Sequence, residues 1–145
     1  MPLISIPTSD PLYRQVLDLR HRILRLPLGL TLSEADITDE DRQHILVYLN
    51  QDRVSGCVLL QTQPEGRMKM RQLAVEQHLQ GMGIGRQLVQ FAEDIARAAQ
   101  ASEMVLHARQ AVLPFYLKLG YTAYGDVFNE VGIPHRSMKK SLELL

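Results

Sequence analysis

Several features that define other classes of protein are scarce in this sequence. The 145 residues include one cysteine, Cys57, so no disulfide can form within the chain and a reducing compartment is expected. The 16 basic and 16 acidic residues cancel. This balance disfavours a nucleic-acid partner, because general nucleic-acid binders need a basic surplus to displace counterions. Cysteine and histidine show no close metal-ligand spacing, so no metal is expected.

Long hydrophobic runs are also missing. No apolar stretch approaches the ~20 residues that span a bilayer. The first seven residues have neither the basic region nor the long apolar stretch of a secretory signal. We therefore expect a cytoplasmic protein with no membrane partner. Apolar residues nevertheless make up 46% of the chain, which disfavours disorder, and the length fits a single domain over residues 1–145.

Helix-like and strand-like patterns follow one another along the chain. Apolar residues recur at helical spacing in three segments, and shorter apolar runs bounded by turn residues indicate strands. The predicted elements are a strand at 3–6, a helix at 10–25, strands at 44–49, 54–63 and 68–75, a helix at 83–101, a strand at 104–108, a helix at 112–119, and strands at 121–127 and 136–142. The expected fold is α/β, with a central mixed β-sheet flanked by helices on both faces.

Two groups of charged residues give opposite indications about a ligand. The first predicted helix carries Arg14, Arg20, Arg22 and Arg25, which are either a solvated face or an attraction for an anionic substrate. The acidic stretch 34–41 is either a solvated loop or an attraction for a cationic substrate. Because the two indications conflict, the sequence leaves the charge of any substrate open.

The most informative segment is a glycine-rich turn between a strand and the long helix. Residues 80–85 are Gln-Gly-Met-Gly-Ile-Gly. Glycine lets the backbone approach a ligand closely, and free N–H groups at a helix start favour an anion such as pyrophosphate. The turn lacks the Lys-Ser or Lys-Thr of a P-loop, and Arg86 replaces the last glycine of a dinucleotide-binding turn. A glycine-rich connection without a ligand is the alternative.

This turn resembles a signature of the GNAT superfamily of acyl-CoA N-acyltransferases, Q/R-x-x-G-x-G/A. Downstream, residues 106–109 and the run Pro-Phe-Tyr-Leu-Lys-Leu-Gly-Tyr at 114–121 resemble the second signature of the family. The Gly-Ile-Pro-His segment at 132–135 resembles a bacterial subgroup of small GNAT proteins. The chain departs from the pattern at Ala111 and Val112, where many relatives carry Asn and Ala.

The resemblance implies an N-acetyltransferase that moves an acetyl group from acetyl-CoA, its cosubstrate, to a primary amine of a small molecule or peptide. The amine would attack directly in a ternary complex. The pyrophosphate would lie on the turn and the pantetheine arm along the third strand of the meander. The implied cofactor-binding residues are Leu73, Ala74, Val75, Gln80, Gly81, Met82, Gly83, Ile84, Gly85 and Arg86. A catalytically silent acyl-CoA-binding module is the alternative, and Arg86 could equally be a solvated arginine.

Tyr116 resembles the tyrosine that the family places near the cofactor sulfur. A tyrosine with a reference pKa of ~10 keeps its proton at neutral pH and could give it to the leaving thiolate. The alternative is a core aromatic residue. A homodimer is common in such families, although no heptad or interface signature fixes the oligomeric state.

The general base is less defined. Some relatives carry a glutamate on the strand where this chain has Arg71 and Gln72, and neither of these is a base. His107 and His21 have no motif support. The remaining candidates are His44, Glu130 and His135. Either of these two histidines could instead be structural, with ordered water carrying the proton.

Overall fold

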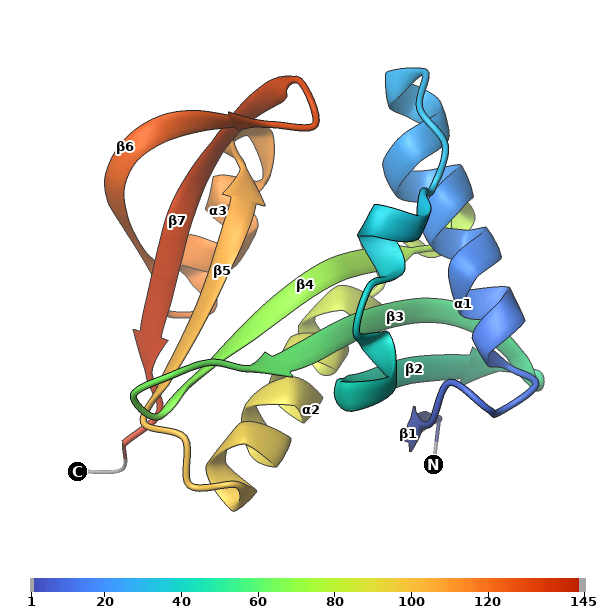
Figure 1. Ribbon diagram of the computed structural model, residues 1–145, viewed down its shortest axis with the longest axis horizontal. Coiled ribbons are helices and arrows are strands. Elements are labelled where there is room, and N and C mark those ends of the chain that lie inside the picture. Colours follow the sequence, from blue (N-terminus) through green and yellow to red (C-terminus); the bar gives the residue numbers. More distant parts are fainter. Residues whose placement is uncertain (1, 144–145) are drawn as a thin grey trace.

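A seven-stranded mixed sheet organises residues 2–143, the part of the chain that the computed structural model describes (Figure 1). The strands are β1 (Leu3–Ile6), β2 (His44–Asn50), β3 (Arg53–Thr62), β4 (Arg67–Val75), β5 (Glu103–Arg109), β6 (Thr122–Glu130) and β7 (Ile133–Ser141). Their order across the sheet is β1-β2-β3-β4-β5-β7-β6. The pairing of β4 with β5 is parallel and the other pairings are antiparallel. The predicted mixed sheet is confirmed.

Three α-helices and several single turns connect the strands. The α-helices are α1 (Tyr13–Arg20), α2 (Ile84–Ala98) and α3 (Leu113–Lys118). The short turns are η1 (His21–Arg25), η2 (Leu26–Leu28), η3 (Glu34–Ile37), η4 (Glu40–Arg42), η5 (Gln77–Leu79) and η6 (Gln110–Val112). The first helix therefore starts three residues after its predicted beginning at residue 10. It also changes to a π-helical turn in η1 where a continuous α-helix was expected.

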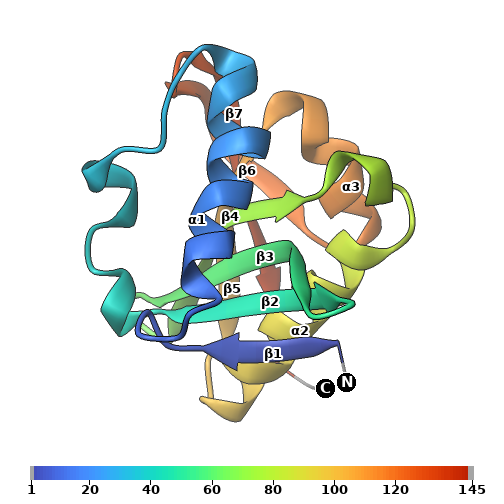
Figure 2. The same ribbon diagram turned by 90° about the vertical axis from the view of Figure 1, so that its right-hand side faces the viewer.

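Helices cover both faces of the sheet, as predicted. Figure 2 shows α1 crossing one face, with α2 behind the strands. Along β2 the buried side chains alternate, because Ile45 packs with α1 while Leu46 packs with α2. Gly56 on β3 lets α2 lie close to the sheet, since a Cβ there would stand 2.9 Å from Leu88 Cδ1. This contact places the start of α2 beside the end of β4.

The centre of the sheet is open at one end. β4 and β5 pair between residues 67–70 and 103–106, and the two strands then diverge (Figure 1). The turn after β4 leads into α2, and β5 leads through η6 into α3. Main-chain groups of the second halves of β4 and β5 consequently border a gap instead of pairing with each other.

Candidate active site

A cavity of about 360 Å³ lies where β4 and β5 separate. Its lining comes from segments far apart in the sequence: η1 and η3, both diverging strands, the start of α3, and the β6–β7 hairpin. The cavity is polar on much of its wall, where Arg25, Lys69, Arg71, His107, Arg109 and Glu130 reach it. The parallel pairing and the hairpin thus collect titratable side chains around one space.

A β-bulge in β4 shapes one wall of this cavity. The register with β3 shifts between Cys57 and Leu59, and Gln72 has a φ of 60°. Before the bulge Met70 packs on the α2 side; after it Leu73 also packs on that side, although a regular strand would turn it to the other face. The bulge therefore brings the Leu73 side chain into the lining of the cavity.

The glycine turn has the conformation that the sequence indicated. Gly81 and Gly83 have φ values of 83° and 87°, which a residue with a side chain rarely adopts. A Cβ on either glycine would meet no atom within 4 Å, so these glycines are required by backbone conformation and border open space. The Gln80 amide donates a hydrogen bond to the Val75 carbonyl (3.0 Å), which ties the turn to the end of β4.

The N-terminus of α2 presents its first backbone N–H groups without a side-chain cap. Gly85 has a different role, because a Cβ there would lie 3.3 Å from Phe115 Cζ. The first GNAT-like signature is therefore packed directly on the second. Arg86 is exposed on the first turn of α2, Met82 is 67% exposed, and the Ile84 side chain is buried in the core. Ala74 is also buried.

Tyr116 lines the cavity from α3 and is 8% exposed. Its ring makes edge contacts with Phe115 and Tyr121, with centroid distances of 5.0 and 5.7 Å. Burial raises the pKa of the Tyr116 hydroxyl above its ordinary value, because the phenolate would be poorly solvated. The side chain is consequently a protonated group at the cavity wall.

Glu130 joins two histidines at another wall. Its Oε1 lies 3.0 Å from His107 Nδ1 and its Oε2 lies 3.6 Å from His135 Nε2. The His135 ring is 3% exposed, and its Nδ1 lies 2.9 Å from the Ile133 carbonyl. A carbonyl oxygen can only accept, so this contact orients the ring through an Nδ1–H donor and directs Nε2 toward the Glu130 carboxylate.

Two of the three predicted base candidates, Glu130 and His135, thus lie together in the cavity lining. His44 does not: it is exposed at the start of β2 and lies outside that lining. His107 belongs to the cluster, although the sequence motifs gave it no role. The alternation along β5 could have indicated its position, because Leu106 and Ala108 are buried while His107 and Arg109 project from the other face.

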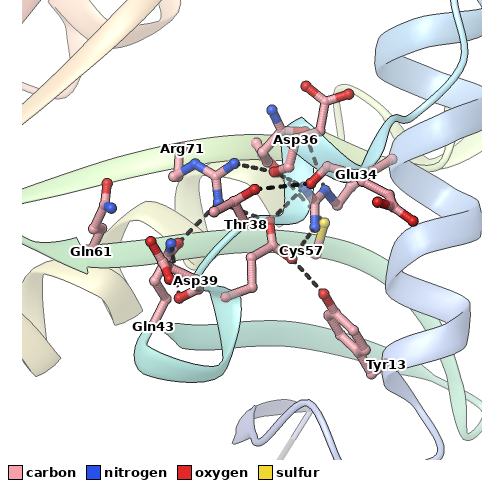
Figure 3. A network of polar contacts seen from close by, with 12 residues as sticks. Tyr13, Glu34, Asp36, Thr38, Asp39, Gln43, Cys57, Gln61 and Arg71 are labelled. Atoms are coloured by element: carbon pink, nitrogen blue, oxygen red, sulfur yellow. Dashed lines mark hydrogen bonds and ion pairs between the residues drawn. The ribbon is translucent and has the colours of Figure 1, made fainter.

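The charged segments of the N-terminal half form a buried network (Figure 3). Glu40 accepts hydrogen bonds from both terminal nitrogens of Arg20, at 2.8 Å each, and from the Tyr13 hydroxyl at 2.6 Å. In Figure 3, Arg71 reaches into the same network from β4; its guanidinium lies 2.9 Å from Glu40. The side chains of Arg20 and Glu40 are 0% and 1% exposed. For these two residues, the alternatives of a solvated helix face and a solvated acidic loop are therefore wrong.

The carboxylates of this network stay ionised because of their partners. Burial alone would raise the pKa of Glu40, but hydrogen bonds from Arg20 and Tyr13 outweigh it and hold the pKa below its usual range. The hydrogen bond from Arg25 lowers the pKa of Asp36 to about 2. Cys57 lies behind the network as buried core, and burial raises the pKa of its thiol to about 12. It is therefore not placed or ionised as a nucleophile.

Comparison with known proteins identifies the class of this fold and site. The model of the acetyltransferase (GNAT) domain family matches residues 31–142. An uncharacterized N-acetyltransferase of Bacillus subtilis, YjcF, is 29% identical over 108 residues, covering 74% of this chain and 76% of that protein. The crystal structure of a protein from Lactobacillus plantarum described as a putative N-acetyltransferase has the same fold, with a TM-score of 0.85 and 25% sequence identity over 99% of this chain and 100% of that one.

The crystal structure of an aminoglycoside 6'-N-acetyltransferase complexed with coenzyme A has the same fold, with a TM-score of 0.78, 19% identity, and coverage of 100% of this chain and 99% of that one. The chain belongs to the GNAT acetyltransferase family, and it is an acetyltransferase enzyme. The predicted membership of the GNAT superfamily is therefore confirmed.

Two further properties concern the described residues. Among residues 2–143, each helix is too short or too polar to cross a membrane. The same residues contain no group of three or more His, Cys, Asp or Glu side chains placed to hold a metal ion.

Proposed function

We propose that the protein transfers an acetyl group from acetyl-CoA to the primary amine of a small molecule or peptide, with both substrates bound together. The observation that carries the proposal is the cavity between β4 and β5, which has a protonated tyrosine on one wall and a carboxylate–histidine cluster on another. Acyl transfer needs an acid for the leaving thiolate and a base for the amine, and this cavity offers both.

The donor would bind along main-chain groups. In the proposed complex the pyrophosphate lies on the N–H groups of residues 80–86, at the positive end of the α2 dipole. The pantetheine arm follows residues 73–75 of β4, beside the gap that β5 leaves open. The related aminoglycoside acetyltransferase was solved with coenzyme A, which supports a coenzyme A ligand for this fold.

The chemistry requires one bond to form and one to break. The neutral amine attacks the thioester carbonyl, forming a C–N bond, and collapse of the tetrahedral intermediate breaks the C–S bond. In the proposed reaction, His135 Nε2, which lies beside Glu130, takes the proton from the amine. Tyr116 gives its proton to the thiolate that leaves. A main-chain N–H of the bulged segment of β4 is the proposed oxyanion donor.

Thiol release tests the function. The protein is incubated with acetyl-CoA and a panel of amines, and free coenzyme A is followed with a thiol reagent. Amine-dependent release is expected for at least one class of amine. Saturable acetyl-CoA binding with no release across the panel would instead identify a silent binding module.

A further inference from the structure

The charges around the cavity do not cancel. The cavity lining holds four cationic side chains against two carboxylates, which leaves two positive charges with the histidines counted as neutral. The cations are Arg25, Lys69, Arg71 and Arg109, and the carboxylates are Asp36 and Glu130. An excess of one sign in a partly enclosed space favours a ligand of the opposite sign.

Two carboxylates of the acidic segment, those of Asp36 and Glu40, are already occupied by arginines. Asp36 pairs with Arg25, at 3.0 and 3.2 Å from two guanidinium nitrogens. Glu40 is shared by Arg20 and Arg71. Asp36 and Glu40 therefore neutralise arginines from α1, η1 and β4, and their carboxylates are not free to attract a cationic substrate.

Lys69 and Arg109 remain without a carboxylate partner within 4.0 Å among residues 2–143. They reach the cavity from β4 and β5, and each is partly buried. Arg109 donates one hydrogen bond, to the Leu24 carbonyl at 2.8 Å, which leaves further guanidinium donors unused. Burial lowers the pKa of both side chains, while the charge of Glu130 acts in the opposite direction.

We propose that the acceptor is a small amine that carries a carboxylate, such as an amino acid, and that Arg109 and Lys69 bind this carboxylate. This inference rests on the proposed acetyltransferase function and names the class of its acceptor. The planar guanidinium of Arg109 matches a carboxylate with two parallel donors, and Lys69 adds a point charge. The cavity volume of about 360 Å³ favours a small molecule over a folded protein chain.

The phosphates of acetyl-CoA fit Arg109 and Lys69 less well than a carboxylate of the acceptor does. Arg109 contacts Leu24 of η1, on the face of the sheet that α1 covers. The glycine turn and the start of α2 belong to the opposite face, where the buried side chains of α2 pack. Lys69 alternates along β4 with Met68 and Met70, which pack on the α2 side, so both cations face away from the proposed phosphate site.

The experiment compares amino acids with their carboxamides as acceptors, using thiol release to measure kcat/KM. A carboxamide keeps the skeleton of the amino acid but lacks its negative charge. Its amine is also less basic and more often neutral, so intrinsic reactivity favours the amide. We expect the best amino acid to exceed its amide on the order of 10²-fold, the range of a charge-assisted hydrogen-bond pair.

Two variants locate the effect. Arg109→Gln and Lys69→Met are each expected to reduce kcat/KM for the amino acid by at least about 10-fold, with little change for the amide and for the Kd of acetyl-CoA. Arg14→Gln, at an exposed arginine on α1, is the matched control and should behave as the wild type. The acid-to-amide comparison on the wild type keeps the test valid even where one variant folds poorly.

The outcomes separate the inference from the function. Release with amides that equals or exceeds release with amino acids would overturn the inference and leave the acetyltransferase function intact. Loss of acetyl-CoA affinity in Arg109→Gln would overturn it as well, by assigning Arg109 to the donor. An absence of release with every amine would reject the acetyltransferase function. The carboxylate site would then be tested by calorimetry on the protein saturated with coenzyme A. Binding of amino acids but not of their amides would support the carboxylate site, and equal binding of both would reject that site.

Discussion

Replacement of Glu40 by glutamine would remove the central charge of the buried network. The Glu40 side chain is 1% exposed and accepts hydrogen bonds from Arg20, Arg71 and Tyr13. Glutamine has nearly the same shape, but it carries no charge and replaces one acceptor oxygen with an N–H donor. That donor would face the guanidinium groups, which are also donors.

The expected loss is large because Arg20 is fully buried. Without Glu40 it retains the Gln72 side-chain oxygen and the Asp36 carbonyl as neutral acceptors. Removing one partner of a buried ion pair costs about 3–5 kcal/mol of unfolding free energy. A chain of this length loses about 3 °C of Tm per kcal/mol, so the melting temperature should fall by roughly 9–15 °C.

Urea and thermal unfolding of the wild type and Glu40→Gln at pH 7 measure this change. Asp18→Asn is the control, because it removes the ion pair between Asp18 and Arg22. This pair is solvent-accessible, since the Asp18 side chain is 61% exposed and the Arg22 side chain is 40% exposed. That pair should contribute less than about 0.5 kcal/mol. A loss below about 1 kcal/mol for Glu40→Gln would refute the argument that the buried Arg20 charge depends on Glu40.

Three further predictions concern the donor site, the proposed acid and the response to pH. Gly83→Asp strains a residue at φ 87° and adds a negative charge to the proposed pyrophosphate site, so the Kd of acetyl-CoA should rise on the order of 10²-fold. Gly125→Asp, at a φ of 72° on β6, controls for backbone strain, and an unchanged Kd in Gly83→Asp would reject the site. Tyr116→Phe should retain acetyl-CoA binding while kcat falls on the order of 10²-fold, the typical effect of losing one acid catalyst; wild-type kcat would exclude Tyr116 from the chemistry. Asp36 has a folded pKa of about 2 against 3.8 when unperturbed, so the unfolded chain binds the proton more readily and wild-type stability should fall as the pH drops from 3.8 toward 2. Asp36→Asn should lose that part of the slope in urea titrations, and parallel slopes in the two proteins would contradict the assigned pKa.

The sequence predicted the order of helices and strands because each element has a local pattern. The alternation of buried side chains along β2 and the helical spacing of apolar residues in α2 both arise from neighbours in the chain. The change from one period to the other at the glycine turn also indicated where the sheet meets α2. The two signatures indicated the family from the sequence alone, whereas the contact between Gly85 and Phe115 that joins them is a property of the fold.

The network and the cluster could not be predicted in the same way. Arg20 and Glu40 are 20 residues apart, and both resemble surface charges until the chain folds them together. The contact of His107 with Glu130 depends on the pairing of β5 with β7 and of β7 with β6. Pairing register of this kind is set by long-range packing, as is the bulge at Gln72, which reverses the alternation of β4.

The divergence of β4 and β5 also has an evolutionary consequence under the proposed function. A donor lying against β4 would be recognised through main-chain groups, which nearly every substitution preserves. The acceptor would meet side chains from η1, β5 and the β6–β7 hairpin, each of which one codon change can replace. Such a fold can acquire new acceptors in single mutational steps while its use of the acyl donor is inherited unchanged.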